Sequence, residues 1–239
     1  QILQSHIDCD RVQDAYCFRC SPQVHGPVID LLVETRRMLE IEINSATDNP
    51  LVFIDDESVD IVSGGNFHGQ NIAMASDSIA VACHEIASMS ERRINQILDP
   101  QWSGQKAFLA NSEGLESGYM IIQYVAAALI AELHLLANSA TTSNVPVSMG
   151  KEDHASMGAT GAFRAIQSTV LLSQVLANEM VCSAEAISRI DEDAGSGVIK
   201  IVDWVRQYVE PFQGDKSMTA ECESLSLHLL DGGMSGVFE

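Results

Sequence analysis

The sequence has few basic and few aromatic residues, and the shortage of positive charge excludes whole classes of partner. Its 239 residues include 13 Lys and Arg against 33 Asp and Glu, which gives a formal net charge of −20, and only 5% are aromatic. A surface this acidic repels phosphate backbones and anionic lipids, so we expect neither a nucleic acid nor a membrane as partner. Because 46% of the residues are hydrophobic and 19% charged, the chain is expected to fold around a substantial core.

The cysteines are too few and too irregularly spaced for a disulfide scaffold. Six cysteines in a chain of this size are more typical of a reducing, cytoplasmic setting. Residues 1–6 contain no basic region before an apolar stretch, so no signal peptide is expected. The most apolar stretch, 120–137, carries Gln123, Glu132 and His134, which indicates a buried core helix rather than a membrane span.

Hydrophobic spacing predicts a mainly all-α fold of long helices with one short β-hairpin, arranged as a single helical domain over 1–239. Apolar residues recur at helical intervals in five segments, 27–43, 69–98, 118–137, 153–190 and 198–209. Two extended pieces, 51–54 and 59–62, flank a turn and form the predicted hairpin. Residues 212–239 mix polar and apolar residues without a clear period and are predicted to be a poorly ordered tail.

The helix predicted over 118–137 is apolar on nearly every face. Two or three neighbouring helices of a small monomer cannot cover such a surface. We therefore expect the bundle to assemble into a larger helical oligomer.

Functional groups gather in four polar segments, 13–20, 44–50, 63–69 and 151–154. Caps and turns are the ordinary explanation for segments rich in Asn, Asp and Gly. Their content also suits a site for a zwitterionic small molecule, because Arg can hold a carboxylate with two hydrogen bonds and Tyr or Glu can transfer protons.

Zinc binding is the main alternative from the residues alone. His6, Cys9, Cys17 and Cys20 have donor atoms suited to tetrahedral zinc. Their spacing is shorter than in common zinc modules, and the chain is large enough to fold without a metal. We therefore predict no metal site and interpret Cys17 and Cys20 as small packing residues.

Six sequence blocks resemble the aromatic amino-acid lyase family, and its histidine ammonia-lyases in particular. They follow one another in family order: QDAYCFRCSPQVHG at 13–26, EINSATDNPL at 42–51, SGGNFHG at 63–69, SERRI at 90–94, ESGYMI at 116–121 and EDHASM at 152–157. The resemblance implies elimination of ammonia from an aromatic amino acid to leave an α,β-unsaturated acid. It also implies a methylidene-imidazolone (MIO) prosthetic group, formed from an internal Ala-Ser-Gly.

The resemblance implies catalytic roles for three residues. Tyr16 would be the base that removes the β-proton of the substrate. Glu152 would pair with an imidazole ring or handle the amine proton, and Phe67 would pack beside the MIO group or the substrate ring.

It also implies three binding residues. Arg19 would hold the substrate carboxylate, Gln13 would line the substrate pocket, and Asn49 would lie near both the substrate and the MIO group. All six residues are expected to converge on one amino-acid-sized cleft, composed from several subunits of a homotetramer.

No Ala-Ser-Gly occurs in the sequence. We therefore expect the chain to be the C-terminal part of a lyase, inactive without the missing N-terminal segment or subunit. Glu152 favours L-histidine as substrate and urocanate as product, whereas Lys151 stands where histidine lyases more often carry Gln. A tyrosine ammonia-lyase or aminomutase, and a non-catalytic lyase-like subunit or fragment, remain the alternatives.

Overall fold

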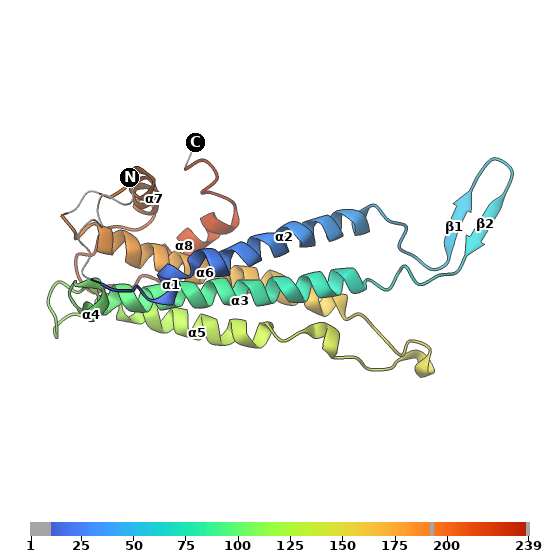
Figure 1. Ribbon diagram of the computed structural model, residues 1–239, viewed down its shortest axis with the longest axis horizontal. Coiled ribbons are helices and arrows are strands. Elements are labelled where there is room, and N and C mark those ends of the chain that lie inside the picture. Colours follow the sequence, from blue (N-terminus) through green and yellow to red (C-terminus); the bar gives the residue numbers. More distant parts are fainter. Residues whose placement is uncertain (1–10, 192–193, 238–239) are drawn as a thin grey trace.

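Four long helices lie side by side and give the molecule its elongated shape (Figure 1). The structure is a computed structural model that describes residues 11–191 and 194–237. The long helices are α2 (Ser21–Ile43), α3 (Gln70–Leu98), α5 (Met120–Leu136) and α6 (Gly158–Ile187). The predicted mainly helical bundle is confirmed.

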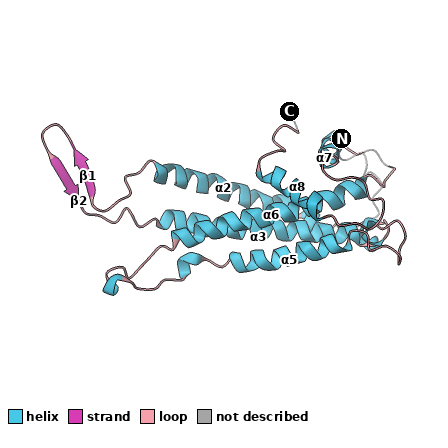
Figure 2. Cartoon of the chain, turned by 180° about the vertical axis from the view of Figure 1, so that it is seen from behind, coloured by secondary structure: helices cyan, strands magenta, loops and turns pink. Residues whose placement is uncertain are grey.

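Short elements occupy the two ends of the bundle. The end at the left of Figure 1 carries α4 (Pro100–Ser103), η2 (Ala107–Leu109) and α7 (Ser196–Val205), with α1 (Tyr16–Arg19) and α8 (Thr219–Leu230) packed nearby. At the opposite end lie η3 (Ala140–Thr142) and η4 (Ser148–Gly150). The predicted hairpin projects beyond that end as β1 (Leu51–Ile54) and β2 (Val59–Val62), paired antiparallel with Leu51 opposite Val62 (Figure 2).

Helices α3 and α6 form the central pair of the bundle because small residues let their backbones approach closely. A Cβ atom added at Gly161 would lie 3.3 Å from the Cβ of Ser76. Beside this contact, the buried carboxylate of Asp77 accepts hydrogen bonds from the backbone N–H groups of Ala140 and Thr141, at 2.9 and 3.0 Å. These bonds fix the η3 turn against α3.

The larger hydrophobic core lies where α3 ends and α5 begins. It includes the fully buried side chains of Ile94, Leu98, Leu109, Tyr119, Val181, Val205 and Leu225. A smaller cluster around Cys83, Ala87, Leu133 and Val175 continues the core along the bundle. The hairpin has no comparable packing, since Val52, Ile54 and Ile61 are each more than half exposed.

A buried carboxylate joins four segments at the core end. Glu185 accepts hydrogen bonds from Arg189 and Arg206, both at 2.9 Å, and from the backbone N–H of Phe212 at 3.1 Å, while the Tyr119 hydroxyl lies 3.4 Å away. Burial alone would raise the pKa of the Glu185 carboxyl. The Phe212 N–H and the two guanidinium groups outweigh burial and hold that pKa below its ordinary value.

The structure differs from the predicted poorly ordered tail over 212–239. Helix α8 forms within that segment, and the Leu225 side chain is fully buried against the larger core. The segment before it is also fixed, because Asp215 accepts hydrogen bonds from the backbone N–H groups of Ser117 and Gly118. Long-range contacts order this segment, and hydrophobic spacing along the sequence does not reveal them.

Helix α2 also begins earlier than predicted, at Ser21 rather than at residue 27. Proline at the first helical turn favours a helix start, and Pro22 occupies that place. Pro27 lies inside the helix, so it does not mark the start that its position in the sequence indicates.

Helix α5 keeps much of its apolar surface exposed. Ile121, Tyr124, Val125 and Leu135 expose between 46% and 61% of their surface. By length and composition alone, Met120–Thr142 and Gly158–Ile187 would be long enough and apolar enough to cross a membrane. Both instead pack against α3 in the bundle. The predicted oligomer would have to cover the exposed face of α5.

Candidate functional site

Tyr16 and Arg19 lie together on the single turn of α1. Residues three apart in a helix share one face, and the guanidinium carbon of Arg19 is 4.9 Å from the centre of the Tyr16 ring. The Tyr16 side chain is 67% exposed. A phenol and a guanidinium are therefore presented together at the surface.

The opposite face of α1 is anchored to the bundle. Cys17 is buried, and its backbone carbonyl accepts hydrogen bonds from Ser21 at 3.1 Å and from Arg93 of α3 at 3.3 Å. Arg93 also donates to Glu179 of α6 at 2.9 Å. Burial raises the pKa of the Cys17 thiol, so the side chain is a neutral packing group, as the packing interpretation predicts. Arg93 thus gives the SERRI block a structural role that its sequence does not reveal.

Gln13 lies at the same end of the bundle. It borders a shallow cavity of about 470 Å³ together with Arg11, Gln101 and Trp102. The Arg11 guanidinium carbon is 5.6 Å from the centre of the Trp102 ring, which helps to seat this segment beside α4. Gln13, Tyr16 and Arg19 therefore form one group of predicted site residues.

Asn49 and Phe67 belong to a second group, at the hairpin end. The Asn49 side-chain oxygen accepts hydrogen bonds from the Ser63 hydroxyl at 3.0 Å and from the Gly64 N–H at 3.1 Å. Asn66 donates to the carbonyl of Ala46 at 2.7 Å. These bonds tie segment 44–50 to segment 63–69 and hold Phe67 with 54% of its surface exposed.

Glu152 lies in a closed loop over 144–155, next to the second group. Val147 and Glu152 exchange two backbone hydrogen bonds, of 3.0 and 3.4 Å, and the Asn144 side chain pairs with the backbone of Ala155 through two bonds of 3.2 Å. Within the loop, Ser148 and Met149 have φ values of 54° and 57°. Such strained conformations are retained mostly where function requires them.

The two groups lie at opposite ends of α3 (Figure 1). Helix α1 contacts α3 at Arg93, whereas Phe67 lies just before the first residue of α3, Gln70. At a rise of 1.5 Å per residue, the 23 steps from Gln70 to Arg93 span about 35 Å. Within one chain the structure therefore does not bring the six predicted residues into one cleft, because a straight helix separates them.

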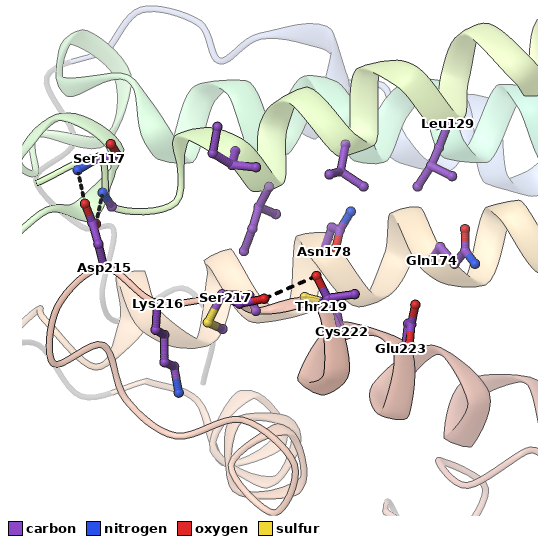
Figure 3. Close-up of a pocket in the computed structure, with 15 residues that line it drawn as sticks. Ser117, Leu129, Gln174, Asn178, Asp215, Lys216, Ser217, Thr219, Cys222 and Glu223 are labelled. Atoms are coloured by element: carbon purple, nitrogen blue, oxygen red, sulfur yellow. Dashed lines mark hydrogen bonds between the residues drawn. The ribbon is translucent and has the colours of Figure 1, made fainter.

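A separate cavity contains none of the predicted residues (Figure 3). It measures about 570 Å³ and lies between α5, α6 and the start of α8, with apolar walls from Ile121, Val125 and Leu129. The buried amide nitrogen of Asn178 has no hydrogen-bond partner there. Burial raises the pKa of the Cys222 thiol to about 11, so this wall offers no thiolate nucleophile at neutral pH. Asp215, Lys216 and Glu223 supply its charged groups. Ser117, Gly118 and Ile121 of the ESGYMI block also border it.

The zinc alternative involves two residues, His6 and Cys9, that lie outside the described part of the chain. Among residues 11–191 and 194–237, no group of three or more His, Cys, Asp or Glu side chains is arranged to hold a metal ion.

Two further candidate residues could not be identified from the sequence. His68 and His154 lie inside the SGGNFHG and EDHASM blocks, but nothing in their spacing shows that they meet. In the structure, His68 Nε2 is 2.9 Å from the backbone carbonyl oxygen of His154. This contact brings the Phe67 segment and the Glu152 loop side by side.

Comparison with curated proteins finds histidine ammonia-lyases. The chain is 43% identical over 234 residues to that of Myxococcus xanthus, which covers 98% of this chain and 46% of the relative. It is 42% identical over 233 residues to that of Gloeobacter violaceus, which covers 97% of this chain and 45% of the relative. The chain thus spans about half the length of the curated relatives it matches.

Comparison with solved structures gives the same fold. Histidine ammonia-lyase from Trypanosoma cruzi superposes with a TM-score of 0.88 at 35% identity, covering 94% of this chain and 44% of that one. Tyrosine aminomutase from Streptomyces globisporus also superposes with a TM-score of 0.88, at 34% identity, covering 98% and 45%. The sequence model of the aromatic amino acid lyase family matches residues 1–207. The chain belongs to the aromatic amino acid lyase family.

Proposed function

We propose that this chain supplies part of a composite active site that eliminates ammonia from L-histidine to give urocanate. The observation that carries the proposal is the Tyr16–Arg19 pair, which presents a potential base and a carboxylate ligand on one exposed helical turn. The curated relatives with about 40% identity are histidine ammonia-lyases, which supports histidine over tyrosine as the substrate.

The first group of residues binds and deprotonates the substrate. Arg19 holds the carboxylate through two parallel hydrogen bonds. Holding that carboxylate fixes the β-carbon relative to Tyr16 and Gln13, and such positioning lowers the barrier of the reaction. The Tyr16 oxygen takes the β-proton, the C–N bond breaks, and a double bond forms between the α- and β-carbons as ammonia leaves.

The second group acts on the side chain and the amine. The Glu152 carboxylate pairs with the imidazole ring or receives the amine proton. The exposed ring of Phe67 packs against the substrate ring or the prosthetic group.

Asn49 and Phe67 fit the prosthetic group that the family uses. The oxygen of the Asn49 amide is engaged by Ser63 and Gly64, while its nitrogen makes no hydrogen bond with the described part of the chain and can donate to a ligand. Phe67 offers an exposed aromatic face in the neighbouring segment. When bound, the MIO group supplies the electrophile that attracts the electrons of the substrate amine. The chain contains no Ala-Ser-Gly to form it, so another polypeptide segment must supply it.

The composite site is proposed to form between copies of the complete enzyme, arranged as a homotetramer. A separation of about 35 Å along α3 is too long for one amino acid to bridge, so Tyr16 of one subunit must meet Phe67 and Glu152 of another. The exposed apolar face of α5 supports such an assembly. A cytoplasmic location is part of the proposal and is supported by the free thiols of the described cysteines.

The proposal is tested by co-expressing this chain with an N-terminal lyase segment that bears Ala-Ser-Gly. Addition of histidine should then produce the absorbance of urocanate. Tyr16→Phe and Arg19→Ala should each lower that rate by orders of magnitude while leaving assembly unchanged. Formation of coumarate or β-tyrosine from tyrosine would instead favour the tyrosine lyase or aminomutase. Undiminished activity in both variants would favour a non-catalytic subunit.

A further inference from the structure

We propose that His68 and His154 form a clasp that positions Phe67 relative to Glu152. The proposal rests on the proposed function, because it assigns positioning residues to the same composite site. His68 Nε2 lies 2.9 Å from the carbonyl oxygen of His154 and 3.4 Å from its Nδ1. The two ring centres are 5.5 Å apart, with an angle of 33° between the ring planes.

The geometry determines which nitrogen of His68 carries a proton. A carbonyl oxygen can only accept a hydrogen bond, so His68 Nε2 must be protonated and must donate to it. His154 Nδ1 lies 3.4 Å from the same nitrogen. The clasp is therefore a directional contact in which the His68 ring donates to the His154 backbone.

The clasp joins two segments that are each held by further hydrogen bonds. Segment 63–69 is tied to Asn49 by two hydrogen bonds, and loop 144–155 is closed by two pairs of bonds. Within the described part of the chain, the hydrogen bonds between these two segments come from His68. The hydrogen bond from His68 therefore determines the position of segment 63–69 relative to loop 144–155.

The clasp is adjacent to both site residues. Phe67 directly precedes His68, and Glu152 lies two residues before His154. Gly69, which follows His68, has a φ of 71° and is the N-terminal cap of α3, so His68 lies two residues before the start of that helix. A change at His68 therefore moves the Phe67 ring relative to the Glu152 carboxylate without touching the substrate itself.

The structural part of the proposal is tested on the full chain by amide NMR spectra. His68→Leu removes the donor, whereas His68→Gln keeps an N–H at a similar reach. We expect His68→Leu to shift the amide resonances of both Phe67 and Glu152 and His68→Gln to leave them close to those of the unaltered chain. Nitrogen spectra of the ring should also show His68 protonated at Nε2. A Glu152 resonance that His68→Leu does not move, or a His68 ring protonated only at Nδ1, would overturn the clasp.

The positioning role is tested in the co-expressed enzyme. Because small misplacements of catalytic groups are costly, His68→Leu should lower kcat about 10- to 100-fold, with a smaller change in the KM for histidine. His68→Gln should restore most of kcat. His228→Leu is the matched control, because His228 also contacts a backbone carbonyl, that of Ser224 at 2.7 Å, but within α8. It should leave kcat unchanged.

The two proposals fail in different ways. An unaltered enzyme without activity on histidine would contradict the proposed function, and the NMR spectra would still decide whether the clasp exists. An active enzyme in which His68→Leu and the control behave alike would refute the positioning role.

Discussion

Replacement of Gly118 by alanine should destabilise the chain strongly. Gly118 has a φ of 56°, and a Cβ atom there would lie 2.4 Å from the carbonyl oxygen of Phe108 and 3.1 Å from the backbone nitrogen of Ala110. That carbonyl cannot withdraw freely, because it accepts a hydrogen bond of 2.9 Å from the N–H of Tyr119. Gly118 itself donates to Asp215 at 2.9 Å.

The expected loss follows from these contacts. Placing alanine in the left-handed region costs about 1–2 kcal/mol. Relieving the clash shifts both the Phe108 carbonyl and residue 118, which weakens the bond from Tyr119 to Phe108 and the bond from residue 118 to Asp215. Each bond contributes about 1 kcal/mol. Together these effects lower the free energy of unfolding by about 3 kcal/mol.

Gly114→Ala is the matched control. Gly114 has a φ of 80°, but an added Cβ would meet no atom within 4 Å. Its replacement therefore costs only the conformational penalty of about 1 kcal/mol. Urea unfolding followed by circular dichroism measures both variants, with the slope of the transition as a check on two-state behaviour. Equal losses in the two variants would refute the steric argument at Gly118.

The remaining predictions concern buried carboxylates. Glu185→Gln leaves the guanidinium groups of Arg189 and Arg206 without their charged partner, and urea unfolding should show a loss of about 3 kcal/mol. Because the pKa of Glu185 is lower in the folded chain than in the unfolded one, its contribution to the free energy of unfolding is complete above about pH 4.3. That contribution is lost as the pH falls through the folded-state pKa. Urea midpoints of the unaltered chain and the Glu185→Gln variant that stay equally far apart in acid would contradict this. Asp77→Ala removes the acceptor of three hydrogen bonds from Ala140 and Thr141. Urea unfolding should show a loss of about 2 kcal/mol in the free energy of unfolding. A loss within experimental error would show that the η3 turn does not need Asp77.

The long helices were predictable because their apolar residues recur at helical intervals. The apolar residues of α3 recur with the helical period, and the prediction of 69–98 agrees closely with Gln70–Leu98. Helix α8 was not predictable in the same way. Its order depends on Leu225 packing into a core built from distant segments, and its own sequence shows no clear apolar stripe.

The candidate site was predictable in its parts but not in its arrangement. The resemblance supplied Tyr16 and Arg19, and the helical spacing alone places them on one face. The position of α1 beside Arg93 depends on a hydrogen bond to Cys17 across the fold, which no local pattern encodes. The contact between His68 and His154 is likewise tertiary, so two histidines within recognised blocks gave no sign that they meet.

Mixing of two inactive variants tests the composite site most directly. A chain with Tyr16→Phe and a chain with Glu152→Gln would each be co-expressed with the Ala-Ser-Gly-bearing segment. The two variant chains would then be co-expressed together, in equal amounts, with the same segment. Urocanate formation would be assayed in all three cases. If each site takes Tyr16 from one subunit and Glu152 from another, random assembly leaves about a quarter of the sites intact. The account predicts about a quarter of the unaltered activity for the mixture and far less for either variant alone. A mixture no more active than the separate variants would contradict it.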